Sequence, residues 1–167
     1  MQDILTCAMG LDVHRDIIVA CLVKGAVDAE PEAETRTFST LIPEMQKLRD
    51  WVIESECRNI AMESTGIYWQ PIYEMLESCF DGEISILVVN ARHMKNVPGR
   101  KTDMKDAQWI ATLLRAGLLK GSFIPDKAFR ELRHLTRYRK SVVHDITAQK
   151  NRIDKFLQSS GFRLTAF

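Results

Sequence analysis

Four acidic residues stand out by their position relative to the strands and helices that the sequence predicts. Asp12 ends the first predicted strand, and Glu63 closes a short apolar strand over residues 59–63. Asp103 and Asp106 are three residues apart, so a helix would place both on one face, with Cβ atoms about 5–6 Å apart. Carboxylates that converge repel unless cations offset them, and oxygen ligands suit Mg²⁺ or Mn²⁺. Such a group can hold two ions roughly 3.5–4 Å apart for phosphodiester chemistry.

Each of these acids also has a simpler interpretation. Asp12 can be a turn aspartate that caps a hairpin, and Glu63 can be an ordinary surface glutamate. Asp103 can be a helix N-cap, with Asp106 a first-turn acid favoured by the helix dipole. The metal-site hypothesis therefore requires a fold that brings residues far apart in the chain to one edge.

The predicted elements can supply such a fold. Alternating or β-branched runs predict strands, and apolar residues at 3–4 spacing predict helices. In chain order these are strands at 4–13, 17–23 and 35–39, a helix from Pro43 to near Ser55, a strand at 59–63, a helix at 68–79 and a strand at 84–89. The fold class expected is α/β, a mixed sheet flanked by helices on both faces. In sheets with parallel strands, sites form beyond the carboxyl ends of those strands, where Glu63 falls.

The second half of the chain is predicted to be largely helical. Residues 91–102 are basic and contain Pro98-Gly99, which indicates an exposed loop, and a helix then runs from near Thr102 or Asp103 to about Ala116. After Pro125, residues 128–158 lack Gly and Pro. Their apolar residues keep a heptad-like spacing that predicts a coiled-coil arm: Leu132, Leu135, Val142, Ile146, Ile153 and Phe156, with Arg139 and Gln149 in the two gaps.

The net charge of +1 hides an uneven distribution. Residues 1–90 have 6 basic and 16 acidic residues, whereas residues 91–167 have 17 basic and 6 acidic residues. A basic second half is typical of nucleic-acid binding, although the two halves can also neutralise each other on folding. The candidate nucleic-acid contacts are Arg92, Lys95, Arg100, Lys101 and Lys105 before the acid pair, and Arg133, Arg137 and Lys140 on the arm, in a stripe with Arg130 and His144. The alternative is a solvated basic loop and a solvated helix flank.

Composition excludes several classes of protein. Apolar residues make up 46% and charged residues 27%, as in a globular domain. No apolar run is long enough for a membrane helix, and the acidic start does not resemble a signal peptide. The cysteines, Cys7, Cys21, Cys57 and Cys79, are scattered and indicate reduced, mostly buried thiols in a cytoplasmic protein that does not bind membranes.

Three further residues have open interpretations. His14, next to Asp12, can be a ligand or base, but a turn histidine is the simpler interpretation. Tyr68 and Trp69 can stack on nucleic-acid bases, but the simpler interpretation is core packing of the helix that follows.

Four motifs together resemble a known family. GLDVHRDIIVACL, AMESTGIYWQPIYEML, VNARHMKNVPGRKTDMKDAQWIATLLRAGLL and RELRHLTRYRKSVVHDITAQKNRI are similar to the amino-terminal part of DEDD-type insertion-sequence transposases, which are related to the Piv DNA invertases. The resemblance implies a ribonuclease-H/RuvC-like fold and DNA recombination. It places Asp12, Glu63, Asp103 and Asp106 in the family's acidic tetrad, which binds Mg²⁺ or Mn²⁺, with two ions expected.

The resemblance also implies an organisation. Residues 1–125 are expected to form the metal-binding catalytic domain and residues 126–167 the helical arm, with a carboxyl-terminal domain carrying a serine nucleophile absent from this chain. The implied partners are DNA, in some relatives a guide RNA encoded by the element, and further copies of the chain through the arm. The competing hypothesis is a nucleic-acid-binding and dimerisation module without chemistry. An actin-like or sugar-kinase ATPase is less favoured, because the glycines are isolated.

Overall fold

The computed structural model describes residues 4–63, 66–80, 82–90 and 106–163. The chain divides into two compact units, Met1–Phe123 and Ile124–Phe167. The basic segment 91–102 and the expected start of the following helix lie outside the described residues. No helix in the described part of the chain is long and apolar enough to cross a membrane.

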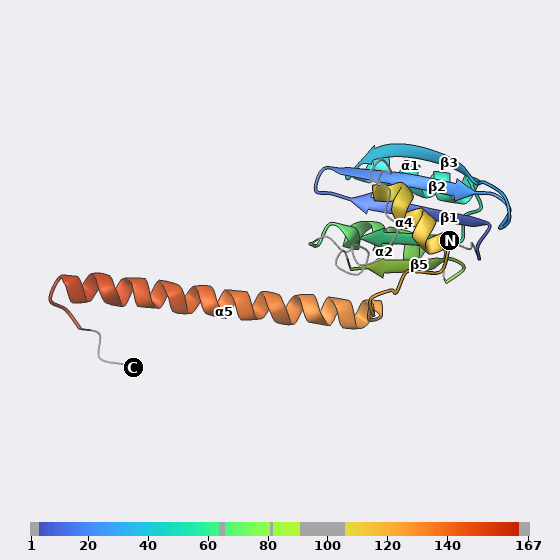
Figure 1. Cartoon of the computed structure of the whole chain (residues 1–167). Helices are drawn as coiled ribbons and strands as arrows, with labels where there is room; N and C mark the ends of the chain where they lie inside the picture. Colours follow the sequence, from blue (N-terminus) through green and yellow to red (C-terminus); the bar gives the residue numbers. More distant parts are fainter. Residues whose placement is uncertain (1–3, 64–65, 81, 91–105, 164–167) are drawn as a thin grey trace. The chain divides into compact units, whose positions relative to one another are not determined.

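The first unit is built on a five-stranded sheet with the order β3-β2-β1-β4-β5 (Figure 1). Strand β1 pairs with β2, and β2 with β3, in antiparallel orientation, whereas β1 with β4 and β4 with β5 are parallel. The strands span Cys7–Val13 (β1), Ile17–Lys24 (β2), Glu32–Ser39 (β3), Asn59–Glu63 (β4) and Ser85–Val89 (β5). This arrangement confirms the mixed sheet that the sequence predicts.

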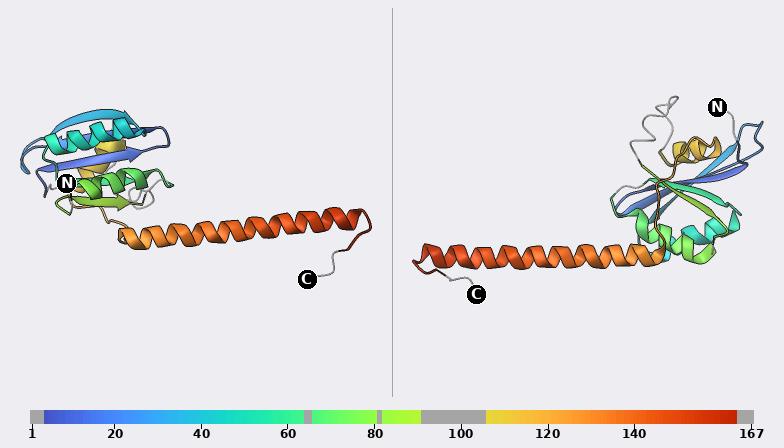
Figure 2. Two further views of the ribbon diagram at one scale, coloured as in Figure 1. Left: turned by 180° about the vertical axis from the view of Figure 1, so that it is seen from behind. Right: turned by 90° about the horizontal axis from the view of Figure 1, so that it is seen from below.

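Helices cover both faces of the sheet, as the sequence predicts. Figure 2 shows α1 (Ile42–Glu54) and α2 (Trp69–Phe80) on one face and α4 (Asp106–Arg115) on the other. Each has an apolar stripe that packs on the sheet; in α1 the buried residues are Met45, Leu48, Trp51 and Val52, the stripe that the spacing predicts. The second unit consists mainly of α5 (Lys127–Ser159), a helix of 33 residues that confirms the long helical arm.

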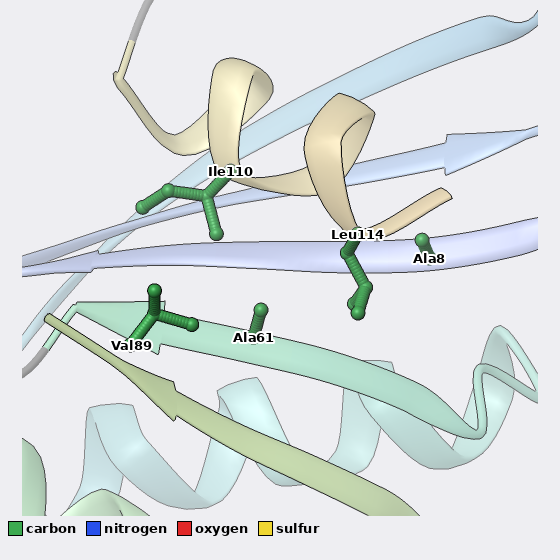
Figure 3. Close-up of a cluster of buried hydrophobic side chains, with 5 residues drawn as sticks. All are labelled: Ala8, Ala61, Val89, Ile110 and Leu114. Atoms are coloured by element: carbon green, nitrogen blue, oxygen red, sulfur yellow. The ribbon is translucent and has the colours of Figure 1, made fainter. Parts of the chain in front are cut away.

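A single glycine determines how closely α4 approaches the sheet. A Cβ added to Gly10 in β1 would lie 2.1 Å from the carbonyl oxygen of Ala107 and 2.5 Å from the amide nitrogen of Ala111. Side chains alternate along a strand, so Ala8, Gly10 and Asp12 all face α4. Figure 3 shows the small core between the sheet and α4, in which Ala8, Ala61, Val89, Ile110 and Leu114 are buried together.

Arg115 anchors the other end of α4 to the start of β1. Its side chain is only 1% exposed, and its Nε donates a hydrogen bond to the Leu5 carbonyl at 2.9 Å. The amide of Ile4 donates to the Arg115 carbonyl at 2.9 Å. Helix α4 therefore runs antiparallel to β1, and its first residue, Asp106, lies toward the carboxyl end of that strand.

Two local details differ from the sequence-based expectations. β3 begins at Glu32 instead of residue 35, because the β2–β3 ladder continues to the pair Lys24↔Glu32 even though this edge is acidic and exposed. Cys79, which the sequence analysis groups with the mostly buried thiols, is exposed on α2, where the fully buried residues are Ile72 and Leu76. Of the other free thiols, Cys21 and Cys57 are buried and Cys7 is half-buried.

Candidate active site

Asp12 and Glu63 lie side by side at the carboxyl ends of two neighbouring parallel strands. The register pairs Leu11 of β1 with Met62 of β4, so the next position along both strands places Asp12 beside Glu63. Neighbouring strands are about 4.8 Å apart, and paired residues point to the same side of the sheet. That side is the α4 face, because Asp12 alternates with Gly10 and Glu63 alternates with Ala61.

Asp106 comes to the same edge from the helix above it. It is the first residue of α4, adjacent to Ala107, whose carbonyl oxygen lies over Gly10, two residues before Asp12. An acid in the first turn of a helix is stabilised by the partial positive charge of the helix N-terminus. Packing of α4 on Gly10 is therefore the physical reason that this acid, distant in sequence, lies at the strand ends.

The structure thus brings three of the four predicted carboxylates to one face and one edge. The fourth, Asp103, lies outside the described residues. Within residues 4–63, 66–80, 82–90 and 106–163, no three His, Cys, Asp or Glu side chains form a group that could hold a metal ion. Asp12, Glu63 and Asp106 share an edge of the sheet without forming such a group by themselves.

The carboxylate of Asp12 is largely enclosed by the surrounding structure. Its side chain is 14% exposed, and one carboxylate oxygen lies 3.1 Å from Nε2 of His14, which is largely exposed. The amide of His14 also donates a 2.9 Å hydrogen bond to the Ile17 carbonyl and so closes the β1–β2 turn. His14 is therefore a turn histidine whose ring also contacts the candidate metal ligand.

The predicted nucleic-acid contacts are described only in part. Arg92, Lys95, Arg100, Lys101 and Lys105 lie outside the described residues. On α5, Arg133, Arg137 and Lys140 are exposed. Arg130 is wrongly placed in this exposed stripe by the sequence pattern: it is 7% exposed, and its Nη1 donates to the Pro125 carbonyl at 2.8 Å at the start of the helix.

The exposed residues of α5 form two opposite stripes. The apolar residues Leu132, Leu135, Val142, Ile146, Ile153 and Phe156 are exposed at positions a and d of successive heptads. With Leu132 at position a, Arg133 and Lys140 take position b and Arg137 takes position f. Positions b and f face away from the a/d seam, so one face of the helix is apolar and the other is basic.

Two thiols lie close together at the opposite end of the sheet, where the Cys57 thiol donates a 3.3 Å hydrogen bond to the Asn59 carbonyl. A hydrogen bond from the Cys57 side chain stabilises the Cys7 thiolate and lowers the pKa of Cys7 to about 7, a shift that the nearby Lys24 charge supports and burial opposes. The same hydrogen bond, together with burial, raises the pKa of Cys57. The thiols flank β1 and β4 at their amino ends, away from the carboxylates.

Comparison with known proteins gives a matching family and similar solved structures. A family model described as a transposase, of the DEDD type of IS110 elements, matches residues 9–161. No curated protein matches the chain. A structure of Thermus thermophilus RuvC superposes with a TM-score of 0.48 at 12% identity, covering 70% of this chain and 99% of that one. T. thermophilus RuvC in complex with a Holliday junction substrate gives a TM-score of 0.49 at 12% identity, covering 71% of this chain and 100% of that one.

Proposed function

The chain belongs to the DEDD transposase family of IS110 elements, and from this premise we propose that its acidic edge carries out divalent-metal-dependent phosphodiester chemistry on DNA during recombination. The observation that supports this most directly is the placement of Asp12 beside Glu63, at the carboxyl ends of parallel strands and on the face covered by the start of α4. Residues near opposite ends of the first unit meet there only because of the fold.

The donor atoms at this edge fit a hard divalent cation. Asp12, Glu63 and Asp106 offer only carboxylate oxygens, and Asp103, one turn before Asp106 in sequence, would add a further carboxylate. We assign all four as ligands of Mg²⁺ or Mn²⁺, with two ions. When bound, such ions activate a nucleophile and stabilise the leaving oxygen of a phosphodiester.

Other residues of the chain would support this chemistry. The His14 ring contacts Asp12 and limits the orientations of its carboxylate. The N-terminal end of α4 offsets part of the negative charge at the edge. Arg92, Lys95, Arg100, Lys101 and Lys105, just before the acid pair in sequence, would bring a phosphate backbone toward acids that otherwise repel it.

The proposal extends to the organisation of the protein. Residues 1–125 are assigned as the metal-binding catalytic domain and residues 126–167 as the arm. The apolar stripe of α5 would pair with the same stripe of a second copy, while its basic stripe would contact nucleic acid, DNA first and an element-encoded guide RNA as a further ligand. A serine nucleophile from another domain would cooperate with the acidic edge, as the family resemblance implies.

A second candidate function is a nucleic-acid-binding and dimerisation module without chemistry. It is favoured by the finding that the described residues contain no ready group of three metal-binding side chains. The exposed apolar and basic stripes of α5 fit this function equally well. The two candidates differ in whether the carboxylates bind metal.

A double substitution, Asp103→Asn with Asp106→Asn, separates them. We expect Mn²⁺ affinity, measured by calorimetric titration, to fall by more than about 100-fold. Loss of a residue that only orients a metal ligand costs about 10- to 100-fold in affinity, and loss of the ligands themselves should cost more. DNA affinity at the same salt concentration should stay within about threefold, since positive charge is retained. Asp145→Asn, at an exposed position of α5, is the control and should leave both values unchanged. A wild-type chain without Mn²⁺ affinity would favour the module.

The basic stripe is tested by salt dependence. We expect Arg133→Ala, Arg137→Ala and Lys140→Ala together to reduce the slope of log affinity for duplex DNA against log salt concentration by about 2–3, because each lost phosphate contact removes about 0.9. Fluorescence anisotropy at several salt concentrations measures this slope. Arg139→Ala, which lies on the apolar stripe, is the matched control with an expected change near zero. Equal slopes for the triple variant and the wild type would show that the stripe does not contact phosphates.

A further inference from the structure

A small cavity opens at the same edge of the sheet, on the side covered by α1 and α2. Its volume is about 220 Å³, and it is lined by Arg15, Thr40, Met45, Ile67, Tyr68 and Ile72, among others. Pockets for drug-sized ligands measure roughly 300–1,000 Å³, so this one suits a single smaller, flat group. Met45 and Ile72 are buried and give it an apolar floor.

Covalent geometry keeps the cavity close to the candidate metal ligands. Arg15 follows Asp12 by three residues, and Ile67 follows Glu63 by four. Since an extended chain spans at most ~3.6 Å per residue, the backbone of Arg15 lies within about 11 Å of that of Asp12, and Ile67 within about 14 Å of Glu63. Duplex DNA rises 3.4 Å per nucleotide, so the cavity is no more than about four nucleotides from a phosphodiester held at the carboxylates.

Tyr68 is the aromatic residue that lines this cavity, and its ring is accessible for stacking on a base. Trp69, its neighbour, packs edge-on against Tyr73 with ring centroids 5.7 Å apart, as expected for a residue anchoring the start of α2. Tyr68 instead is 39% exposed. Gly66 has a φ of +56°, the left-handed region, and a Cβ there would lie 3.6 Å from the Tyr68 ring. Trp69 is half-buried against Tyr73, whereas Tyr68 is exposed and does not have the core-packing role that was its simpler interpretation.

The rim of the cavity favours an anion. The Arg15 side chain is 79% exposed, and its ion pair with the exposed Asp16 is long, with Nε and Oδ1 3.8 Å apart. Thr40 donates a 2.9 Å hydrogen bond from its hydroxyl to the Arg15 carbonyl, which fixes the backbone beneath the guanidinium. Helices α1 and α2 both begin beside the cavity, near Thr40 and Tyr68, and helix N-termini attract phosphate.

We propose that this cavity, the base pocket, receives one unstacked nucleobase of the DNA strand bound at the carboxylate edge, with the Tyr68 ring stacking on the base and Arg15 contacting the adjoining phosphate. Each part of the cavity matches a part of a nucleotide. The apolar floor would receive the edge of the base, the exposed aromatic ring would stack on its face, and the long cationic side chain at the rim would contact its phosphate. This inference rests on the proposed function for the position of the strand, and it adds where a base within a few nucleotides of the reacting phosphate goes.

The test uses the full chain and single-stranded DNA that carries one 5-iodouracil, a base that crosslinks to a stacked aromatic side chain on long-wavelength irradiation. Mass spectrometry of the crosslinked peptides should place the base on Tyr68. Tyr68→Ala should weaken binding of the unmodified strand about 5- to 100-fold, the range for one lost base-stacking contact. Tyr68→Phe, which keeps the ring, should bind within about twofold of the wild type.

Controls identify which proposal fails. Tyr138→Ala, at an exposed position of α5, should leave the Tyr68 crosslink unchanged. An abasic site in place of the 5-iodouracil should abolish the crosslink to Tyr68. Crosslinks that map only elsewhere, or equal affinities of Tyr68→Ala and the wild type, would overturn the base pocket, while intact Mn²⁺ binding would leave the proposed function standing. A Tyr68 crosslink in a chain that binds no Mn²⁺ would keep the pocket and reject the chemistry.

Discussion

Asp12→Asn is expected to lower Mn²⁺-dependent DNA cleavage by at least about 10³-fold. The amide keeps the size of the side chain and an oxygen that can still accept from His14, but it loses the negative charge that holds a cation. Several kcal/mol of transition-state stabilisation come from a bound divalent ion, and each 1.36 kcal/mol is a factor of ten in rate. Single-turnover cleavage of a labelled DNA substrate, with saturating protein, measures the effect.

A matched variant separates this charge effect from general changes. Asp28→Asn alters an exposed aspartate between β2 and β3 and should cleave like the wild type. Thermal unfolding of Asp12→Asn should stay close to that of the wild type, since Asp12 lies at the end of its strand. Cleavage by Asp12→Asn within tenfold of the wild type would remove Asp12 from the metal ligands.

Gly10→Ala is expected to destabilise the fold by about 3 kcal/mol or more. The added methyl group would lie 2.1 Å from the Ala107 carbonyl oxygen and 2.5 Å from the Ala111 amide nitrogen, and backbone atoms cannot move aside as a side-chain tip can. Overpacking of a well-packed core costs about 1–3 kcal/mol and occasionally more. Urea unfolding followed by circular dichroism measures the loss.

The same substitution should also weaken metal binding. Relieving the clash requires α4 to move away from β1, and Asp106 at the start of α4 would move with it. Gly121→Ala is the control, because a Cβ there would meet only the flexible Leu87 side chain, at 3.3 Å, and should cost less than about 1 kcal/mol. Equal stabilities of Gly10→Ala and Gly121→Ala would contradict the close packing of α4 on the sheet.

Local patterns predicted the elements of the first unit closely. The strand over residues 59–63 is β4 as observed, and the predicted helix from Pro43 to near Ser55 differs from α1 by about one residue at each end. These elements follow from side-chain periodicity and from proline and glycine at their ends, which act within a few residues. The same reasoning predicted the strand-end positions of Asp12 and Glu63.

Features that depend on distant parts of the chain were not predictable in this way. Gly10 in an apolar strand does not reveal that the backbone of α4 will lie against it, and Arg130 in a basic stripe does not reveal that it will be buried against Pro125. Tyr68 is exposed beside a left-handed turn at Gly66, and hydrophobicity alone does not encode that exposure. The proximity of Asp106 to the strand ends follows from helix packing, so only the fold could supply it.

Metal binding at the acidic edge can be seen directly in a crystal structure of the chain grown with Mn²⁺ and recorded at a wavelength where manganese scatters anomalously. We expect two anomalous peaks, roughly 3.5–4 Å apart, within coordination distance of Asp12, Glu63, Asp103 and Asp106. A well-ordered sheet at saturating Mn²⁺ with no peak at this edge, or with these carboxylates more than about 12 Å apart, would contradict it, because two-ion chemistry requires a shared site.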